Sequence, residues 1–133
     1  GVPVIAFGQD DFPAFWSRTS GLMAPLRMDS AAEIAKAHLM RGVLGLSGGQ
    51  LVANPIPKAS EISAQSLAPL IAQATQEAAE QGVSGKGVTP FLLQRLFELT
   101  DGASLTANIA LVLNNARLAS EIACCLAKPA GND

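Results

Sequence analysis

The stretch of residues 104–116 (SLTANIALVLNNA) is almost continuously apolar, yet it contains three asparagines, Asn108, Asn114 and Asn115. Its composition predicts a helix that is buried all round. A buried primary amide is costly unless both its donor and its acceptor find partners. The asparagines therefore form either a structural polar network or a surface that recognises the edge of a nucleobase through hydrogen bonds.

Composition and charge bound the class of protein. The chain has 133 residues, of which 49% are hydrophobic and 15% charged, and this predicts one packed domain over residues 1–128 with a flexible tail over residues 129–133. A net charge of -2 without a basic block argues against binding to a nucleic acid polymer. No apolar run reaches the roughly 18 residues of a membrane span. The neighbouring Cys124 and Cys125 cannot easily pair, which favours a reduced, cytoplasmic protein.

The first half of the chain alternates strand and helix patterns. Residues 3–7 and 50–54 are the two strong strand candidates, and Ser30 with Glu33 forms a capping box that starts a helix between them. A strand, helix, strand order predicts an α/β fold with a parallel sheet. Two strands leave that sheet incomplete. The loop of residues 8–27 is long and carries aromatic and polar side chains, which is more typical of functional loops than of plain connectors.

The second half is predicted to be helical. One amphipathic helix begins near Ser66, which places Pro69 in its first turn, and Gly82 ends it. Thr89 is predicted to cap the next helix, and Ser104 to cap a last helix that runs to about Ala127. The fold class is therefore α/β, the C-terminal portion of an α/β/α layered fold with few strands and a mostly helical second half.

Several chemistries find no support among these residues. His38 is the only histidine, so a histidine metal site, a Ser-His-Asp triad or a Cys-His dyad cannot be complete within the chain. Asp10 and Asp11 are adjacent in a loop and make a poor acid and base pair. A nucleophilic lysine needs desolvation or a nearby cation, and none of the four lysines lies in an apolar run: Lys36, Lys58, Lys86 and Lys128.

A set of short motifs, in a fixed order along nearly the whole chain, resembles the pseudouridine-5′-phosphate glycosidases, the family that includes the indigoidine-synthase-A-like proteins. The motifs are residues 1–5 (GVPVI), 12–15 (FPAF), 18–20 (RTS), Arg27 with 29–30 (DS), 52–57 (VANPIP), 85–86 (GK) with 89–93 (TPFLL), and 104–105 (SL) with 108–109 (NI) and 114–116 (NNA).

The resemblance implies a specific reaction. Members of the family reversibly cleave the C–C glycosidic bond of pseudouridine 5′-phosphate, a small-molecule substrate, to give uracil and ribose 5-phosphate. They use an imine between a lysine and the opened sugar, an acidic residue and a divalent metal, typically Mn2+. An imine supplies the electron sink that breaking a C–C bond requires. Members of the family form trimers, so a homotrimer is expected.

The resemblance also implies what the chain lacks. The family's imine-forming lysine, its acidic residue and its metal ligand precede the strand that begins at Gly1, so the chain corresponds to the C-terminal part of the enzyme and alone is expected to be inactive. It would act when joined to, or associated with, the missing N-terminal part. The alternative is a stand-alone, non-catalytic scaffold or a uracil-binding or oligomerisation domain.

Asn108 is the predicted substrate-binding residue, since the resemblance places the family's uracil-contacting asparagine there. A first-turn position after Ser104 would aim its amide at a cleft beside the positive end of the helix. Asn114 and Asn115 are interpreted as buried amides bonded to neighbouring backbone. No role is assigned to four further residues near the expected cleft: Arg18, Thr19, Ser20 and Asn54.

Overall fold

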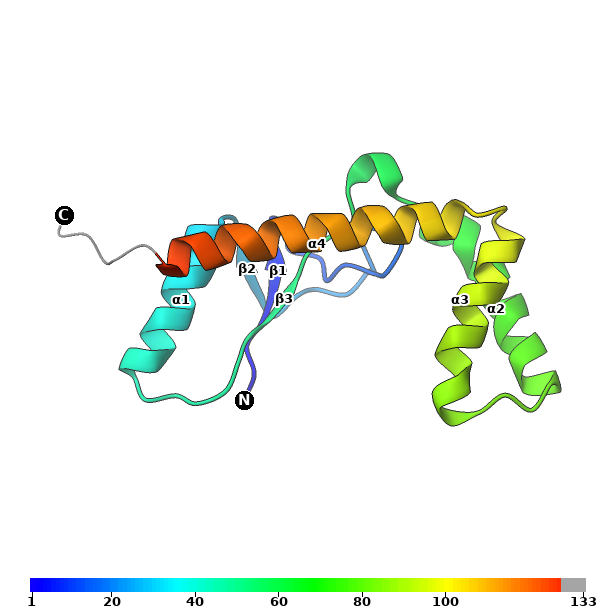
Figure 1. Ribbon diagram of the computed structural model, residues 1–133, viewed down its shortest axis with the longest axis horizontal. Helices are drawn as coiled ribbons and strands as arrows, with labels where there is room; N and C mark the ends of the chain where they lie inside the picture. Colours follow the sequence, from blue (N-terminus) through cyan, green and yellow to red (C-terminus); the bar gives the residue numbers. More distant parts are fainter. Residues whose placement is uncertain (128–133) are drawn as a thin grey trace.

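A computed structural model describes residues 1–127, and the tail predicted for residues 129–133 lies outside the described residues. Four α-helices, three strands and two single-turn 3₁₀ helices (Lys58–Ser60 and Gly85–Gly87) make up this part of the chain. Helix α4 (Ala103–Ala127) runs along the long axis of the molecule, with α1 (Ala31–Val43) at one end and the pair α2 and α3 at the other (Figure 1).

The sheet has three parallel strands in the order β2-β1-β3. Strand β1 (Val4–Phe7) is central, and β3 (Leu51–Ala53) matches the second predicted strand. The third strand, β2 (Leu26–Met28), was not predicted. It has only three residues, and its middle residue is Arg27, which pairs with Asp10 at 3.0 Å and Asp29 at 2.8 Å, so no apolar run marks it.

Helix α1 confirms the predicted capping box. The Ser30 hydroxyl accepts a hydrogen bond from the main-chain N–H of Glu33, and the Glu33 carboxylate accepts one from the main-chain N–H of Ser30. The helix ends at Val43, just before Gly45, whose φ of 67° is one that glycine adopts without strain. Because α1 connects β2 to β3 across β1, it is the crossover helix of a parallel unit.

Helices α2 (Ala64–Glu80) and α3 (Val88–Leu99) lie side by side as a helical hairpin. Two predicted starts were wrong. Helix α2 is capped by Ser63, so Pro69 lies in its second turn, where a hydrogen-bonding N–H is lost. Helix α3 begins at Val88, so Thr89 is inside the helix and is not its N-cap. Pro90 still falls within the first turn, where its missing N–H costs little.

Helix α4 differs from its prediction in two respects. It begins at Ala103, directly after the turn formed by Asp101 and Gly102, so Ser104 lies inside the helix and does not cap it. It is also far from fully buried, since its only buried residues are Ser104, Ala107, Leu111 and Leu118. Among the described helices α4 is long and apolar enough to cross a membrane by length and composition, a weak indication because core helices pass the same test.

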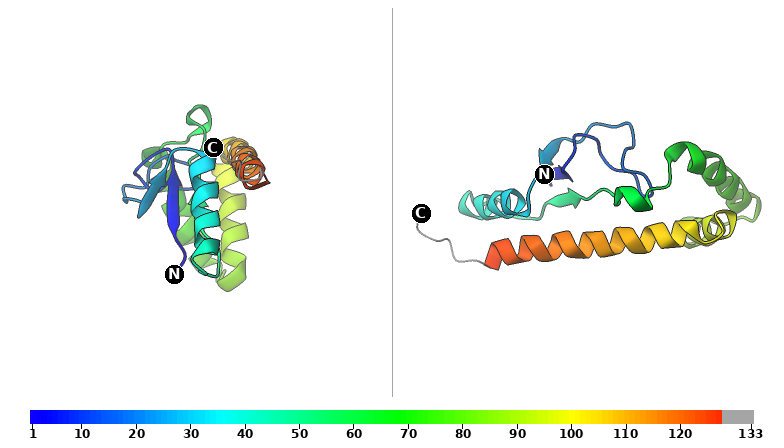
Figure 2. Two further views of the ribbon diagram at one scale, coloured as in Figure 1. Left: turned by 90° about the vertical axis from the view of Figure 1, so that its left-hand side faces the viewer. Right: turned by 90° about the horizontal axis from the view of Figure 1, so that it is seen from above.

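The predicted α/β class is confirmed: a small parallel sheet is followed by a mostly helical second half. In the right-hand view of Figure 2, the sheet, the loop between β1 and β2, and α1 lie along one flank of α4. On that flank Ile56, which follows β3, forms a small core with Ala107 and Leu111 of α4, and Trp16 and Ile62 pack against this core. This core positions the first turns of α4.

Candidate functional site

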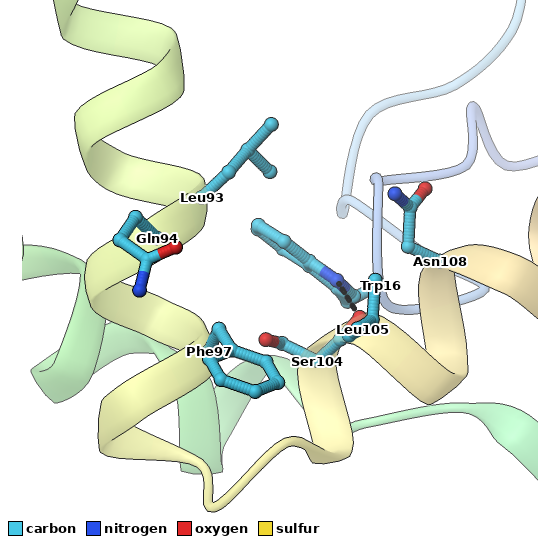
Figure 3. A pocket seen from close by; sticks show the side chains of 7 residues that line it. All are labelled: Trp16, Leu93, Gln94, Phe97, Ser104, Leu105 and Asn108. Carbon is cyan, nitrogen blue, oxygen red and sulfur yellow. Dashed lines mark hydrogen bonds between the residues drawn. The ribbon is translucent and has the colours of Figure 1, made fainter.

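A cavity of about 280 Å3 lies beside the first two turns of α4, between that helix and α3 (Figure 3). It contains the predicted site residue Asn108. Its walls come from three parts of the chain, namely the loop between β1 and β2, helix α3 and helix α4, and the lining residues are Trp16, Leu93, Gln94, Phe97, Ser104, Leu105 and Asn108.

Trp16 is held in the cavity wall by its own hydrogen bond. Its indole N–H donates to the main-chain oxygen of Ser104 at 3.1 Å, and the Phe15 ring packs edge-on against it with centroids 4.5 Å apart. An indole N–H that is partly buried generally finds such a partner. The aromatic face is therefore fixed relative to the start of α4.

The loop that carries Trp16 is tied down by Arg18. The guanidinium donates from Nη1 to the main-chain oxygen of Ile56 at 2.8 Å, and Gln9 donates from Nε2 to the main-chain oxygen of Arg18 at 2.6 Å. The main-chain N–H of Arg18 donates to the Glu61 carboxylate at 2.7 Å. Arg18 therefore anchors the loop and does not line the cavity. This finding supplies a structural role for a residue whose role the sequence left open.

The first turn of α4 is stabilised by Thr100, which takes the part predicted for Ser104. The Thr100 hydroxyl accepts from the main-chain N–H of Ser104 at 3.0 Å. Because the helix begins at Ala103, Asn108 lies in the second turn and not in the first. Its amide is consequently further from the positive helix end than predicted, and the effect of the helix dipole on it is weaker.

The three asparagines of α4 have different surroundings. Asn114 is partly buried and donates from Nδ2 to the main-chain oxygen of Pro55 at 3.2 Å, the kind of backbone bond expected for it. Asn115 is exposed and accepts from the Asn54 amide at 3.1 Å, so the prediction of a buried amide bonded to backbone was wrong there. Asn108 is half-buried, lines the cavity, and makes no side-chain hydrogen bond to another described residue.

The cavity combines apolar walls with two primary amides. Gln94 donates from Nε2 to the Glu98 carboxylate at 3.1 Å, which leaves its carbonyl oxygen as an acceptor (Figure 3). The Asn108 amide offers a donor and an acceptor. No side chain that titrates near neutral pH is among the lining residues. The cavity can therefore hold a small planar ligand with a polar edge, but its lining has no acid or base, and so nothing to activate the Ser104 hydroxyl as a nucleophile.

Beside the cavity, Arg95 of α3 makes ion pairs with Glu77 of α2 and with Glu98, the latter at 2.8 Å. Hydrogen bonds from Arg95 and Gln73 lower the pKa of the Glu77 carboxyl, and hydrogen bonds from Gln94 and Arg95 lower the pKa of the Glu98 carboxyl. Both carboxylates are thus ionised at neutral pH, which makes them unsuited to donate a proton.

The other residues considered in the sequence lie elsewhere. Ser20 donates to the main-chain oxygen of Phe12 at 2.5 Å, and Thr19 accepts from Ser17 through its main-chain oxygen at 2.8 Å. His38 is exposed on α1. Within residues 1–127, no three His, Cys, Asp or Glu side chains are grouped so that they could hold a metal ion.

The fold and the cavity together define a portion of a layered α/β protein with a recess for one small ligand. The sequence pattern of the family described as indigoidine synthase A like protein matches residues 1–125, and the chain belongs to this family. Trp16, Gln94 and the apolar wall residues were not predicted as site residues. The long aromatic loop indicated only the segment in which Trp16 lies.

Curated relatives are similar over nearly all of the chain. The pseudouridine-5′-phosphate glycosidase of Jannaschia sp. (strain CCS1) is 73% identical over 123 residues, which are 92% of this chain and 41% of the relative. That of Paracoccus denitrificans is 65% identical over 127 residues, which are 96% of this chain and 42% of the relative. The chain thus spans about two fifths of the length of these relatives.

Solved structures share the fold. The prealnumycin C-glycosynthase AlnA, crystallised in complex with ribulose 5-phosphate, superposes with a TM-score of 0.83 at 27% identity, over 94% of this chain and 41% of that one. An indigoidine synthase A-like protein from Thermotoga maritima superposes with a TM-score of 0.80 at 37% identity, over 92% of this chain and 40% of that one.

Proposed function

We propose that this chain is the uracil-binding part of a pseudouridine-5′-phosphate glycosidase. Such an enzyme reversibly cleaves the C–C glycosidic bond of pseudouridine 5′-phosphate to uracil and ribose 5-phosphate. The proposal is supported by relatives of that name at 65% to 73% identity. The observation that carries it is Asn108, the one α4 asparagine that lines the cavity and makes no side-chain hydrogen bond to a described residue.

The geometry supports a specific role for Asn108. A uracil edge presents ring N–H groups next to carbonyl oxygens, so one amide can accept from the ring and donate to it. Trp16 offers an aromatic wall between that amide and Gln94, whose carbonyl oxygen is a further acceptor in the cavity (Figure 3). A half-buried amide without a protein partner is well placed to bond to a ligand.

The bond-breaking chemistry belongs, in this proposal, to the part of the relatives that the chain does not span. That part would supply the lysine that forms an imine with the sugar and the acidic residue. Manganese is included through the family resemblance, but residues 1–127 contain no group of side chains suited to hold it. We therefore assign no catalytic step and no metal ligand to the described residues. A cytoplasmic homotrimer completes the proposal, again by resemblance.

The test is a reconstitution. The 133-residue chain is mixed with the separately expressed remainder of the Jannaschia relative and supplied with Mn2+, uracil and ribose 5-phosphate, and the C-nucleotide is followed by chromatography. We expect turnover only with both pieces. Turnover by the chain alone, or none from a pair that demonstrably associates, would contradict the proposal.

The matched variants are Asn108→Ala and Asn114→Ala, because both remove an amide from the same helix. In the reconstituted pair, Asn108→Ala is expected to lower kcat/KM by about 100-fold, which corresponds to about 2–3 kcal/mol for the hydrogen bonds lost to the ligand. Asn114→Ala is expected to lower it by less than about fivefold, since its amide binds Pro55 outside the cavity. Equal losses would assign Asn108 to packing.

Calorimetric titration of the chain alone with uracil addresses the non-catalytic alternative. Binding by the chain, combined with no turnover from the associated pair, would favour a stand-alone uracil-binding domain.

A further inference from the structure

Helix α4 has a second apolar face that no described element covers. Its large residues are strongly exposed, from 48% for Leu105 to 60% for Leu113, with Ile109 and Val112 between these values. We call these four residues the α4 stripe. Their spacing of four, three and one along the helix is that of a helix face made for burial.

The α4 stripe lies away from the core. At about 100° per residue, its four members fall within roughly 100° of arc on the side opposite Ala107, Leu111 and Leu118, which are buried. Figure 2 shows the sheet, the long loop and α1 along one flank of α4, with the opposite flank bare of other described elements. The sequence predicts a helix buried on all sides because both faces of the helix are apolar.

The stripe is continuous with the cavity. Leu105 belongs to both, and the neighbouring cavity residues Leu93 and Phe97 on α3 are each 39% exposed. Asn108 lies on the helix between the buried face and the stripe. An element packed on the stripe would therefore border the cavity and could shield the Asn108 amide from water, which strengthens its hydrogen bonds to a ligand.

The edge strands of the sheet are exposed as well, although Ile5 and Ala6 of the central strand are buried. Parallel sheets normally have both faces covered and further strands beside them. Here β2 and β3 are edge strands, and Leu26 and Leu51 on them are 46% and 51% exposed. Contiguous exposed apolar surface is typical of interaction sites.

We propose that the α4 stripe is the docking surface for the remaining three fifths of the family's chain, the part of the Jannaschia relative outside the matched region. The match covers 41% of that relative, so a polypeptide longer than this chain is left to pack against it. A lipid surface fits less well, because the same face of the helix continues with Ala116, Ser120 and Ala123 and the helix carries Arg117 and Glu121. Continuity with a cavity that lacks its own reactive groups favours the remainder over a second copy.

The experiment measures association. The remainder of the Jannaschia relative is immobilised, and the 133-residue chain is titrated onto it as wild type, as Ile109→Lys/Val112→Lys, and as Glu121→Lys. The last is the matched control, since it also places lysine at an exposed position of α4 but far around the helix from the stripe. We expect the double variant to weaken binding at least about tenfold and the control to change it less than about twofold.

Footprinting with hydroxyl radicals keeps the test independent of variant folding. In the wild-type pair, oxidation of Leu105, Ile109 and Leu113 should fall severalfold relative to the isolated chain. Unchanged oxidation in a pair that has formed, equal binding by the double variant, or protection that depends on concentration of the isolated chain would overturn the proposal. It rests on family membership and not on the activity: an assembled but inactive pair would contradict the proposed function alone.

Discussion

The indole N–H of Trp16 donates to the main-chain oxygen of Ser104, 88 residues later in the chain, across 3.1 Å. This bond joins the loop after β1 to the first turn of α4. It connects the two parts of the chain that carry the aromatic wall and the Asn108 amide of the cavity.

Trp16→Phe keeps an aromatic ring but removes the donor, and it leaves the Ser104 carbonyl without that partner. We expect the free energy of unfolding to fall by about 1–2 kcal/mol, measured by urea denaturation of the chain. Phe15→Leu is the control, because Phe15 is 48% exposed and donates no such bond; its effect should be smaller. A Trp16→Phe variant as stable as wild type would mean that the bond contributes nothing net.

The variants Asn114→Ala and Asn108→Ala should rank in opposite orders by stability and by activity. Asn114→Ala should lose more stability, and Asn108→Ala more activity. Replacing either by alanine raises helix propensity by a similar amount, so the difference between the two variants isolates the side-chain contacts. Asn114→Ala loses the bond to Pro55 and should be less stable than Asn108→Ala by about 1 kcal/mol. Thermal unfolding followed by circular dichroism checks this. The reverse order would assign the structural role to Asn108.

Local chemistry explains which elements could be predicted from the sequence. The capping box of Ser30 and Glu33 is decided within a few residues and was confirmed. Strand β2 could not be predicted, since its three residues include an arginine and it exists only because β1 lies beside it. The prediction that α4 is buried on all sides failed for a similar reason. The sequence pattern shows which faces of a helix are apolar, but not whether another element covers them.

The cavity was predicted only in part. Asn108 was identified through a family resemblance, whereas Gln94 gives no sign in the sequence, because it is one of several glutamines on helix surfaces. Its position across the cavity from Asn108 results from the packing of α3 near the first turns of α4 (Figure 3). Gln94 and Asn108 are 14 residues apart and lie on two helices, so their relative position depends on the turn between those helices. Gly102 permits the geometry of this turn with its φ of 81°.

Pro69 is expected to lower the stability of the folded chain, so that its replacement should raise it. It is exposed in the second turn of α2, where its ring displaces a helical hydrogen bond. Pro69→Ala is expected to raise the free energy of unfolding by about 2 kcal/mol, after allowing for the greater freedom of the unfolded chain. Pro90→Ala is the control, because Pro90 lies in the first turn of α3, and it should change stability little. Urea denaturation of both variants and of wild type measures the free energies of unfolding. A Pro69→Ala variant less stable than wild type would show that the proline fits its site without strain.

The ion pair of Arg95 with Glu77, which joins α3 to α2, should make the stability of the helical hairpin depend on pH. Arg95 donates from Nη2 to Glu77 at 3.1 Å and from Nη1 to Glu98 at 2.8 Å.

Because hydrogen bonds from Arg95 and Gln73 lower the pKa of Glu77 below its ordinary 4.5, the folded state binds this proton less readily than the unfolded state. The resulting stabilisation is present above the unfolded pKa and is lost as the pH falls through the lowered folded pKa. Arg95→Leu should therefore destabilise the chain at pH 7, and the difference from wild type should shrink as the pH falls below about 4.5. Urea denaturation between pH 3 and pH 7, at low and at about 1 M salt, measures this difference.

Arg117→Leu is the control, since no ion pair joins Arg117 to a described residue, and its effect should not vary with pH over this range. An Arg95→Leu effect of the same size at pH 3 and pH 7 would show that the arginine acts through the packing of its aliphatic stem and not through Glu77.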